Sequence, residues 1–186
     1  MTSRLFGPKT GLLANFKPDY FADSIYDIDG HWLADKNIKA VIIDVDNTIM
    51  ARGERLPDGK LRLWVGGLRA GGIKLLVVSN NWTDRVKQIA RHLDLPLLAP
   101  AAKPLGAAYK IAIDRLGAPA AATAIIGDQL FTDVLGGNRV GIKTILVAPI
   151  SEVDLAHTRA LRVLERFLLK RLSGRLLVAG HWQKAV

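Results

Sequence analysis

The chain of 186 residues contains no cysteine. This absence excludes disulfide bonds, thiolate chemistry and zinc or iron–sulfur sites that are held by cysteine. Four histidines are present, and none has the spacing to another histidine that is typical of metal ligands; they are His31, His92, His157 and His181. We interpret them as ordinary surface or core residues.

Aromatic residues are scarce, with three tyrosines, four tryptophans and five phenylalanines. A net charge of +9 would suit a nucleic-acid partner. Proteins that bind single-stranded nucleic acid usually combine such charge with aromatic side chains on which the bases stack, and no basic–aromatic pattern of this kind is found. Nucleic-acid association is therefore the less favoured interpretation.

Long hydrophobic runs are also missing. No stretch approaches the ~20 apolar residues of a membrane-spanning helix, and residues 1–15 lack the hydrophobic region of a secretory signal. No glycine-rich GxGxxG loop follows a predicted strand, which counts against a dinucleotide site. We expect a protein of the cytoplasm or of an organelle matrix or stroma, soluble or peripheral at a membrane, and not secreted.

What is present is a pattern of short apolar runs that alternate with helical segments. Nearly half of the residues are hydrophobic, and the length fits one domain, with a lead-in at 1–38, a core at 39–150 and a tail at 151–186. Alternating strands and helices predict an α/β fold with three layers, a Rossmann-like parallel sheet covered by helices on both faces. The expected strands are 40–43, 73–78, 123–126 and 144–147, and the expected helices are 61–70, 83–92, 105–116 and 133–140. Residues 23–28 alternate and predict a short extended segment.

Polar residues follow these strands in a particular order. Asp44-Val45-Asp46-Asn47-Thr48 closes the run 40–43, and Ser79-Asn80-Asn81 closes the run 73–78. Lys103-Pro104 precedes a helical stretch, and Gly127-Asp128-Gln129-Leu130-Phe131-Thr132-Asp133 follows the run 123–126. Unpaired acids are costly inside a sheet. Ligands usually lie at the carboxyl ends of parallel strands, so these acids predict a site there.

This series resembles the four motifs of the haloacid dehalogenase (HAD) phosphatase superfamily: DxDxT, Ser or Thr, Lys, and GDxxxxD. The resemblance covers roughly residues 38–150. The residues within the motifs are similar to those of the YqeG-type branch, which includes the mitochondrial and plastid phosphatidylglycerophosphate phosphatases. It implies a HAD-like fold of the capless subclass III and a phosphatase activity.

Phosphoryl transfer needs a nucleophile, neutralisation of charge on the phosphoryl oxygens and a proton for the leaving group. Asp44 suits the nucleophile, through an aspartyl-phosphate, and Asp46 suits the general acid and base. We expect the substrate phosphate to be bound by Thr48, Ser79, Asn80 and Lys103.

The resemblance also implies a metal held by Asp44 and by the backbone carbonyl of Asp46. Asp128 is the second side-chain ligand that we expect, and Asp133 orients a metal-bound water or reaches the ion itself. Hard oxygen ligands of this kind suit Mg²⁺.

Each motif has a simpler interpretation when it is taken alone. Asp44 and Asp46 could belong to a turn or cap, and Ser79 is typical of a turn or N-cap. Lys103 could be solvated at a helix entrance, and Asp128 could form an Asx-turn. The four motifs in the right order and spacing make the joint coincidence improbable.

The spacing between the motifs leaves no room for a large cap domain. Residues 49–78 separate Thr48 from Ser79, and residues 80–102 separate Ser79 from Lys103. Both intervals must also hold a helix and a strand, so residues 49–59 can form a small flap at most. An open site suits a phosphate displayed on a bulky molecule such as a membrane lipid. It suits a small sugar phosphate less well, unless an oligomer closes the site.

The tail predicts a basic amphipathic helix. Its basic face comprises Arg159, Arg162, Arg166 and Lys170, and its opposite face comprises Leu161, Leu164, Leu168 and Leu172. This helix could dock on an anionic bilayer, or its leucines could pack on the domain with the basic residues solvated.

Together these features predict a capless, Mg²⁺-dependent phosphomonoesterase. With the resemblance, they favour phosphatidylglycerophosphate as substrate and an anionic phospholipid surface as partner. A soluble phosphatase that acts on a nucleotide, sugar or protein phosphate is one alternative. A nucleic-acid-associated or scaffold protein is the other.

Overall fold

The computed structural model describes residues 13–151, 163–165, 167–168, 175–178 and 181–184. Its centre is a parallel sheet of six strands in the order β1-β6-β5-β2-β3-β4. The strands are β1 (Tyr20–Ala22), β2 (Ala40–Ile43), β3 (Lys74–Val78), β4 (Leu97–Leu98), β5 (Thr123–Gly127) and β6 (Lys143–Val147). The predicted α/β class is confirmed.

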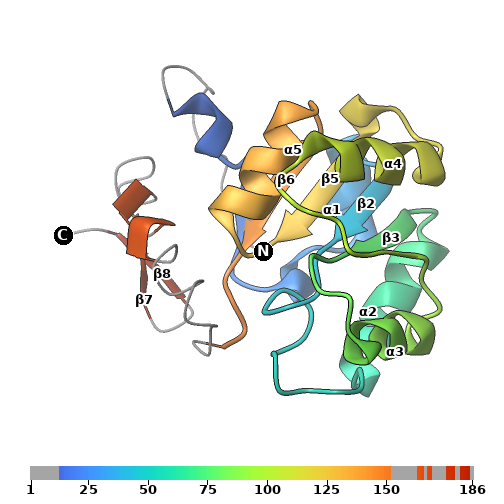
Figure 1. Ribbon diagram of the computed structural model, residues 1–186. Coiled ribbons are helices and arrows are strands. Elements are labelled where there is room, and N and C mark those ends of the chain that lie inside the picture. Colours follow the sequence, from blue (N-terminus) through green and yellow to red (C-terminus); the bar gives the residue numbers. More distant parts are fainter. Residues whose placement is uncertain (1–12, 152–162, 166, 169–174, 179–180, 185–186) are drawn as a thin grey trace.

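Helices cover both faces of this sheet (Figure 1). They are α1 (Gly30–Asp35), α2 (Gly59–Ala70), α3 (Asp84–His92), α4 (Gly106–Leu116) and α5 (Leu135–Arg139). The first three pack on one face, where Val41 and Ile43 point. On the other face, α4 packs against Ile42 and Ile125. Successive residues of a strand point to opposite faces, so the uninterrupted apolar run of β2 serves both layers.

The middle of the sheet fixes where the candidate site lies. Every residue of β2 is buried, and its neighbours are β3 and β5, with Ala40 opposite both Lys74 and Thr123. Three adjacent parallel strands therefore end together at one edge, where the residues that follow them can meet.

The expectation for residues 23–28 was wrong. Ile25–Asp27 forms a 3₁₀-helix, η2, and the extended segment lies just before it, in β1. Ser24 starts this turn, because its hydroxyl accepts the Tyr26 N–H at 3.3 Å and its own N–H donates to Asp27 Oδ2 at 3.1 Å. These local side-chain bonds satisfy the backbone without a neighbouring strand.

No cap domain interrupts the described core, as predicted. Between β2 and α2 lies the flap (residues 49–59), which contains neither a helix nor a strand before α2 begins. Asp58 then starts α2 by accepting the Leu61 N–H at 2.7 Å. Thr83 caps α3 in the same way, through the Val86 N–H at 3.4 Å.

The tail is described only in part. Residues 163–165 and 167–168 are helical, with Leu164 and Phe167 exposed and Leu168 packed near Phe21 and Leu146. The basic face proposed for this helix, Arg159, Arg162, Arg166 and Lys170, lies outside the described residues. An antiparallel hairpin that the sequence pattern did not predict follows, formed by β7 (Arg175–Val178) and β8 (His181–Lys184). Among the described helices, none combines the length and the apolar character that crossing a bilayer requires.

The strand β5 continues into a π-helical turn, η4 (Leu130–Val134), before α5 begins. Tyr109 of α4 is fully buried against this region and donates its hydroxyl to the Thr132 carbonyl at 2.7 Å. A Cβ on Gly136 would lie 2.3 Å from the Tyr109 ring, so any residue other than glycine would clash with the ring at this position.

We expect Gly136→Ala to lower the free energy of unfolding by about 1–3 kcal/mol, because it overpacks this contact. The measurement is urea denaturation. Gly66→Ala is the matched control in α2, where an added Cβ meets no atom within 4 Å. There the better helix propensity of alanine should stabilise the protein by up to about 1 kcal/mol. Equal stability of the two variants would contradict the packing argument.

Candidate active site

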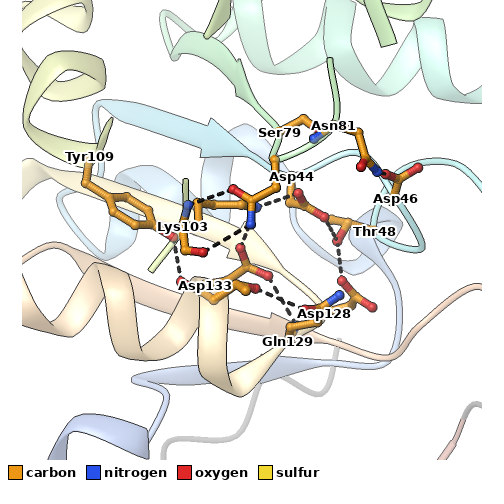
Figure 2. Close-up of polar contacts among 12 residues, drawn as sticks. Asp44, Asp46, Thr48, Ser79, Asn81, Lys103, Tyr109, Asp128, Gln129 and Asp133 are labelled. Carbon is orange, nitrogen blue, oxygen red and sulfur yellow. Dashed lines mark hydrogen bonds and ion pairs between the residues drawn. The ribbon is translucent and has the colours of Figure 1, made fainter. Parts of the chain in front are cut away.

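A cluster of buried polar side chains lies at the carboxyl edge of the sheet (Figure 2). Asp44 directly follows β2, and its N–H still donates to the Ile126 carbonyl of β5 at 3.0 Å. Asp128 directly follows β5. The predicted residues Asp44, Asp128 and Asp133 thus come together, and one carboxylate oxygen of each lies within 4.8 Å of the other two.

Lys103 is the cation of this cluster. Its Nζ lies 2.5 Å from Asp44 Oδ1 and 2.7 Å from Asp133 Oδ1, and all three side chains are buried. Burial alone would lower the pKa of Lys103, but the charges of Asp133 and Asp44 raise it well above its usual range. The lysine is therefore a fixed positive charge.

Asn80 sets the position of Lys103 through the backbone. The Lys103 N–H donates to Asn80 Oδ1 at 2.6 Å, and Asn80 Nδ2 donates to the Lys103 carbonyl at 3.1 Å. Asn80 follows β3, so these two bonds tie the loop of the lysine to the sheet. In this structure the Asn80 amide is thus engaged by protein backbone, whereas we had expected it to bind phosphate.

Thr48 joins the two carboxylates that follow β2 and β5. Its hydroxyl lies 3.1 Å from Asp44 Oδ2 and 3.1 Å from Asp128 Oδ1. A hydroxyl has a single proton to donate, so it bonds one carboxylate at a time. Ser79 is buried nearby, and its hydroxyl accepts the Asn81 N–H at 3.1 Å.

Asp133 enters the cluster from the π-helical turn η4. Its Oδ2 accepts the Gln129 N–H at 3.2 Å. The absence of a side chain at Gly127 makes room for it, since a Cβ there would lie 2.3 Å from the Asp133 carboxyl. Burial raises the pKa of Asp133 above its ordinary value of 3.8, Lys103 lowers it, and the charges of Asp44 and Asp128 raise it, so that together they bring this pKa to about 7.

Asp46 lies beside the cluster with partners of its own. Its Oδ1 accepts Arg85 Nη1 at 2.6 Å, and its Oδ2 accepts the side-chain amide of Asn81. Sequence reasoning did not single out Arg85 or Asn81. Arg85 carried one signal: it lies in the first turn of a predicted helix, where the helix dipole disfavours a cation unless an acid is close.

The donor set fits a divalent metal ion. Asp44, Asp128 and Asp133 offer hard carboxylate oxygens, and Lys103 forms ion pairs with Asp44 and Asp133. Oxygen donors with excess negative charge favour a divalent cation of the Mg²⁺ or Ca²⁺ type.

Comparison with known proteins identifies similar sequences and structures. A family model for HAD-hydrolase-like proteins matches residues 100–150. The chain is 38% identical over 168 residues to "Probable phosphatase YqeG" of Bacillus subtilis, covering 90% of this chain and 95% of that protein. It is 30% identical to Phosphatidylglycerophosphate phosphatase 1, chloroplastic/mitochondrial, of Arabidopsis thaliana, over 77% of this chain and 44% of that protein.

A solved structure with a similar chain path is the cobalt-bound deoxy-D-mannose-octulosonate 8-phosphate phosphatase of Haemophilus influenzae. Its TM-score is 0.49 at 19% identity, and the match covers 73% of this chain and 89% of that one.

The pKa of Asp133 predicts how the stability of the metal-free protein depends on pH. Between about pH 4 and pH 7 the native protein holds a proton that the unfolded chain has released. The contribution of Asp133 is therefore present at low pH and lost as the pH rises toward 7, with a slope of at most about 1.4 kcal/mol per pH unit.

Asp133→Asn should remove this slope. The measurement is urea denaturation at several pH values between 5 and 7 in the presence of EDTA. Asp114→Asn, at an exposed position of α4, is the matched control and should keep the slope. A slope that persists in Asp133→Asn would contradict the assignment.

Proposed function

We propose that this chain, which belongs to the HAD hydrolase family and is a phosphatase, hydrolyses phosphatidylglycerophosphate to phosphatidylglycerol and phosphate. The observation that carries the reaction is the contact of Asp44 with Lys103, beside Asp128 and Asp133. The similarity to a phosphatidylglycerophosphate phosphatase supports the choice of substrate.

Asp44 is the proposed nucleophile. One of its carboxylate oxygens forms a bond to phosphorus while the bond from phosphorus to the lipid alcohol breaks. Asp46 gives its proton to the departing alkoxide. Lys103 keeps a positive charge beside Asp44, where negative charge gathers on the phosphoryl oxygens. The products of this step are the free lipid alcohol and phospho-Asp44.

Water completes the reaction in a second step. Asp46, now a carboxylate, takes a proton from the water that attacks phosphorus, and the bond to Asp44 breaks. Phosphate leaves and the Asp44 carboxylate is restored. We propose that the hydroxyls of Thr48 and Ser79, which are buried in the same cluster as Asp44, donate to phosphate oxygens in both steps.

We propose Mg²⁺ as the ion of this site. The side chains of Asp44 and Asp128 and the backbone carbonyl of Asp46 would hold it, with Asp133 orienting a bound water or reaching the ion. When bound, Mg²⁺ supplies positive charge to the phosphoryl oxygens without a proton transfer.

A cavity beside the site supports a substrate with a large leaving group. It has a volume of about 550 Å³, within the usual range of ligand pockets. Thr48 lines it, as do the flap (residues 49–59), residues 23–26 and residues 148–150. We propose that the glycerol and phosphodiester of the lipid head group bind here.

The rim and floor of this cavity suit an amphiphilic ligand. Leu56 and Ile150 line it and remain 57% and 49% exposed, which favours contact with lipid at its mouth. Lys60 is an exposed residue of the lining, and its Nζ lies 3.8 Å from the centre of the Tyr26 ring. We propose that it offers a positive charge to the phosphodiester, among lining carboxylates that belong to Asp23, Glu54 and Asp58. We therefore propose peripheral association with an anionic membrane surface.

The assay that tests the function measures phosphate release from phosphatidylglycerophosphate in mixed micelles with Mg²⁺. Soluble esters are run beside it: p-nitrophenyl phosphate, glycerol 3-phosphate and a nucleoside monophosphate. We expect preferential turnover of the lipid, loss of activity in EDTA, and a fall of at least about a thousandfold in Asp44→Asn. Turnover of soluble esters alone would keep the chemistry and overturn the lipid assignment.

The cavity makes a separate prediction. Lys60→Glu should raise KM for phosphatidylglycerophosphate about tenfold, because it replaces an attractive charge by a repulsive one. The kcat, and the kinetics with p-nitrophenyl phosphate, should change little. Lys110→Glu makes the same change of charge at an exposed site on α4, outside the cavity lining. If both variants raise KM equally, the effect belongs to the overall charge and the cavity assignment is wrong.

A further inference from the structure

Arg85 contacts two separate parts of the chain with one guanidinium group. Its Nη1 donates to Asp46 Oδ1 at 2.6 Å. Its Nε donates to the Glu54 carbonyl and its Nη2 to the Ala51 carbonyl, also at 2.6 Å each. Ala51 and Glu54 both belong to the flap (residues 49–59), so this side chain joins the flap to the Asp46 carboxylate.

The flap also closes a turn of its own at this point. Its own turn is closed by the Glu54 N–H donating to the Ala51 carbonyl at 3.1 Å, and by the Ala51 N–H donating to Glu54 Oε2 at 3.1 Å. Both bonds stay within residues 51–54, so they shape the turn but do not attach it to the domain. Of the hydrogen bonds described for these four residues, those from Arg85 reach another element.

The helix that carries Arg85 is anchored to the core. Arg85 lies in the first turn of α3, which Thr83 caps and which buries Val86 and Ile89 in the core. The Arg85 side chain is 19% exposed and that of Asp46 is 9% exposed. A planar guanidinium can meet several acceptors with fixed geometry, whereas a lysine offers a single point of charge.

We infer that Arg85 is a positioning residue, which fixes the Asp46 carboxylate for proton transfer and holds the flap in place through the same side chain. The inference rests on the role proposed above for Asp46. Arg85 acts through Asp46 and does not need to touch the substrate. Its loss should affect the chemical step, since a displacement of about 1 Å in a reacting group can cost about a hundredfold in rate.

The kinetic test is a double-mutant cycle, measured with the best substrate found in the assay above. Arg85→Ala should lower kcat about a hundredfold and change KM less than about threefold. Arg85→Lys should recover part of this loss. Arg85→Ala combined with Asp46→Asn should be no slower than Asp46→Asn alone, because a residue that acts through Asp46 has no effect once that carboxylate is gone.

The matched control is Arg91→Ala, which removes an exposed arginine from the same helix. It should leave kcat and KM unchanged. Thermal unfolding of each variant establishes that it is folded under the assay conditions. If the losses in Arg85→Ala and Asp46→Asn multiply in the double variant, the inference is overturned.

Limited proteolysis tests the flap independently of any substrate. Arg52 and Arg55 are trypsin sites within the flap. Arg85→Ala should be cleaved there about tenfold faster than the wild type, and Arg91→Ala at the wild-type rate, because cleavage follows the population of the opened segment. Equal cleavage of Arg85→Ala and wild type would overturn the link to the flap.

The two measurements separate this inference from the proposed function. Full activity in Asp46→Asn would overturn both the proton-transfer role and the kinetic part of the inference, while the protease result would still decide the flap. Loss of activity in Asp46→Asn with an additive cycle would leave the proposed function intact and reject the role of Arg85 in placing Asp46, with the link to the flap again decided by the protease result.

Discussion

The paired contact of Lys103 with Asp44 and Asp133 is the interaction on which the site depends. Carboxylates that lie this close in a buried place repel one another, and each loses hydration. The lysine supplies a positive charge at 2.5 Å and 2.7 Å from two of them. The sheet edge, the π-helical turn η4 and the loop that carries Lys103 each deliver one member of this cluster. A shift of any of these elements would leave a buried charge without its partner, which is strongly destabilising.

Much of this arrangement could be predicted from the order of residues along the chain. Apolar runs predicted the central strands, and parallel strands bring the residues after them to a common edge, so Asp44 and Asp128 were expected to meet. The partners of side chains in irregular segments could not be predicted in this way. Arg85 bonds carbonyls in the flap (residues 49–59), and Asn80 bonds the backbone of Lys103. No periodic pattern places these groups, because their positions depend on how the loops close over the finished sheet. The turn at Ser24 was not predicted for a related reason. Its local side-chain hydrogen bonds stabilise a 3₁₀-helix, although the alternation of polar and apolar residues there is typical of a strand.

The flap (residues 49–59) contributes both to the cavity lining and to the contacts of Arg85. It borders the cavity on one side and is bonded by Arg85 on another. A ligand that enters the cavity therefore meets the same segment that is connected to Asp46. The proposed leaving-group site and the contacts of the Asp46 carboxylate thus involve one short stretch of chain.

The two hydrogen bonds between Asn80 and Lys103 have a further consequence. They hold the main chain at position 103, so the site of the ammonium group is specified by a neighbour rather than by the lysine side chain. Asn80 thus fixes the backbone position, and Lys103 supplies the positive charge. A neutral side chain at position 103 would leave these two backbone bonds available, but the buried carboxylates of Asp44 and Asp133 would lose the cation that pairs with them. The loop path and the charge balance of the site therefore depend on different residues, Asn80 for the first and Lys103 for the second.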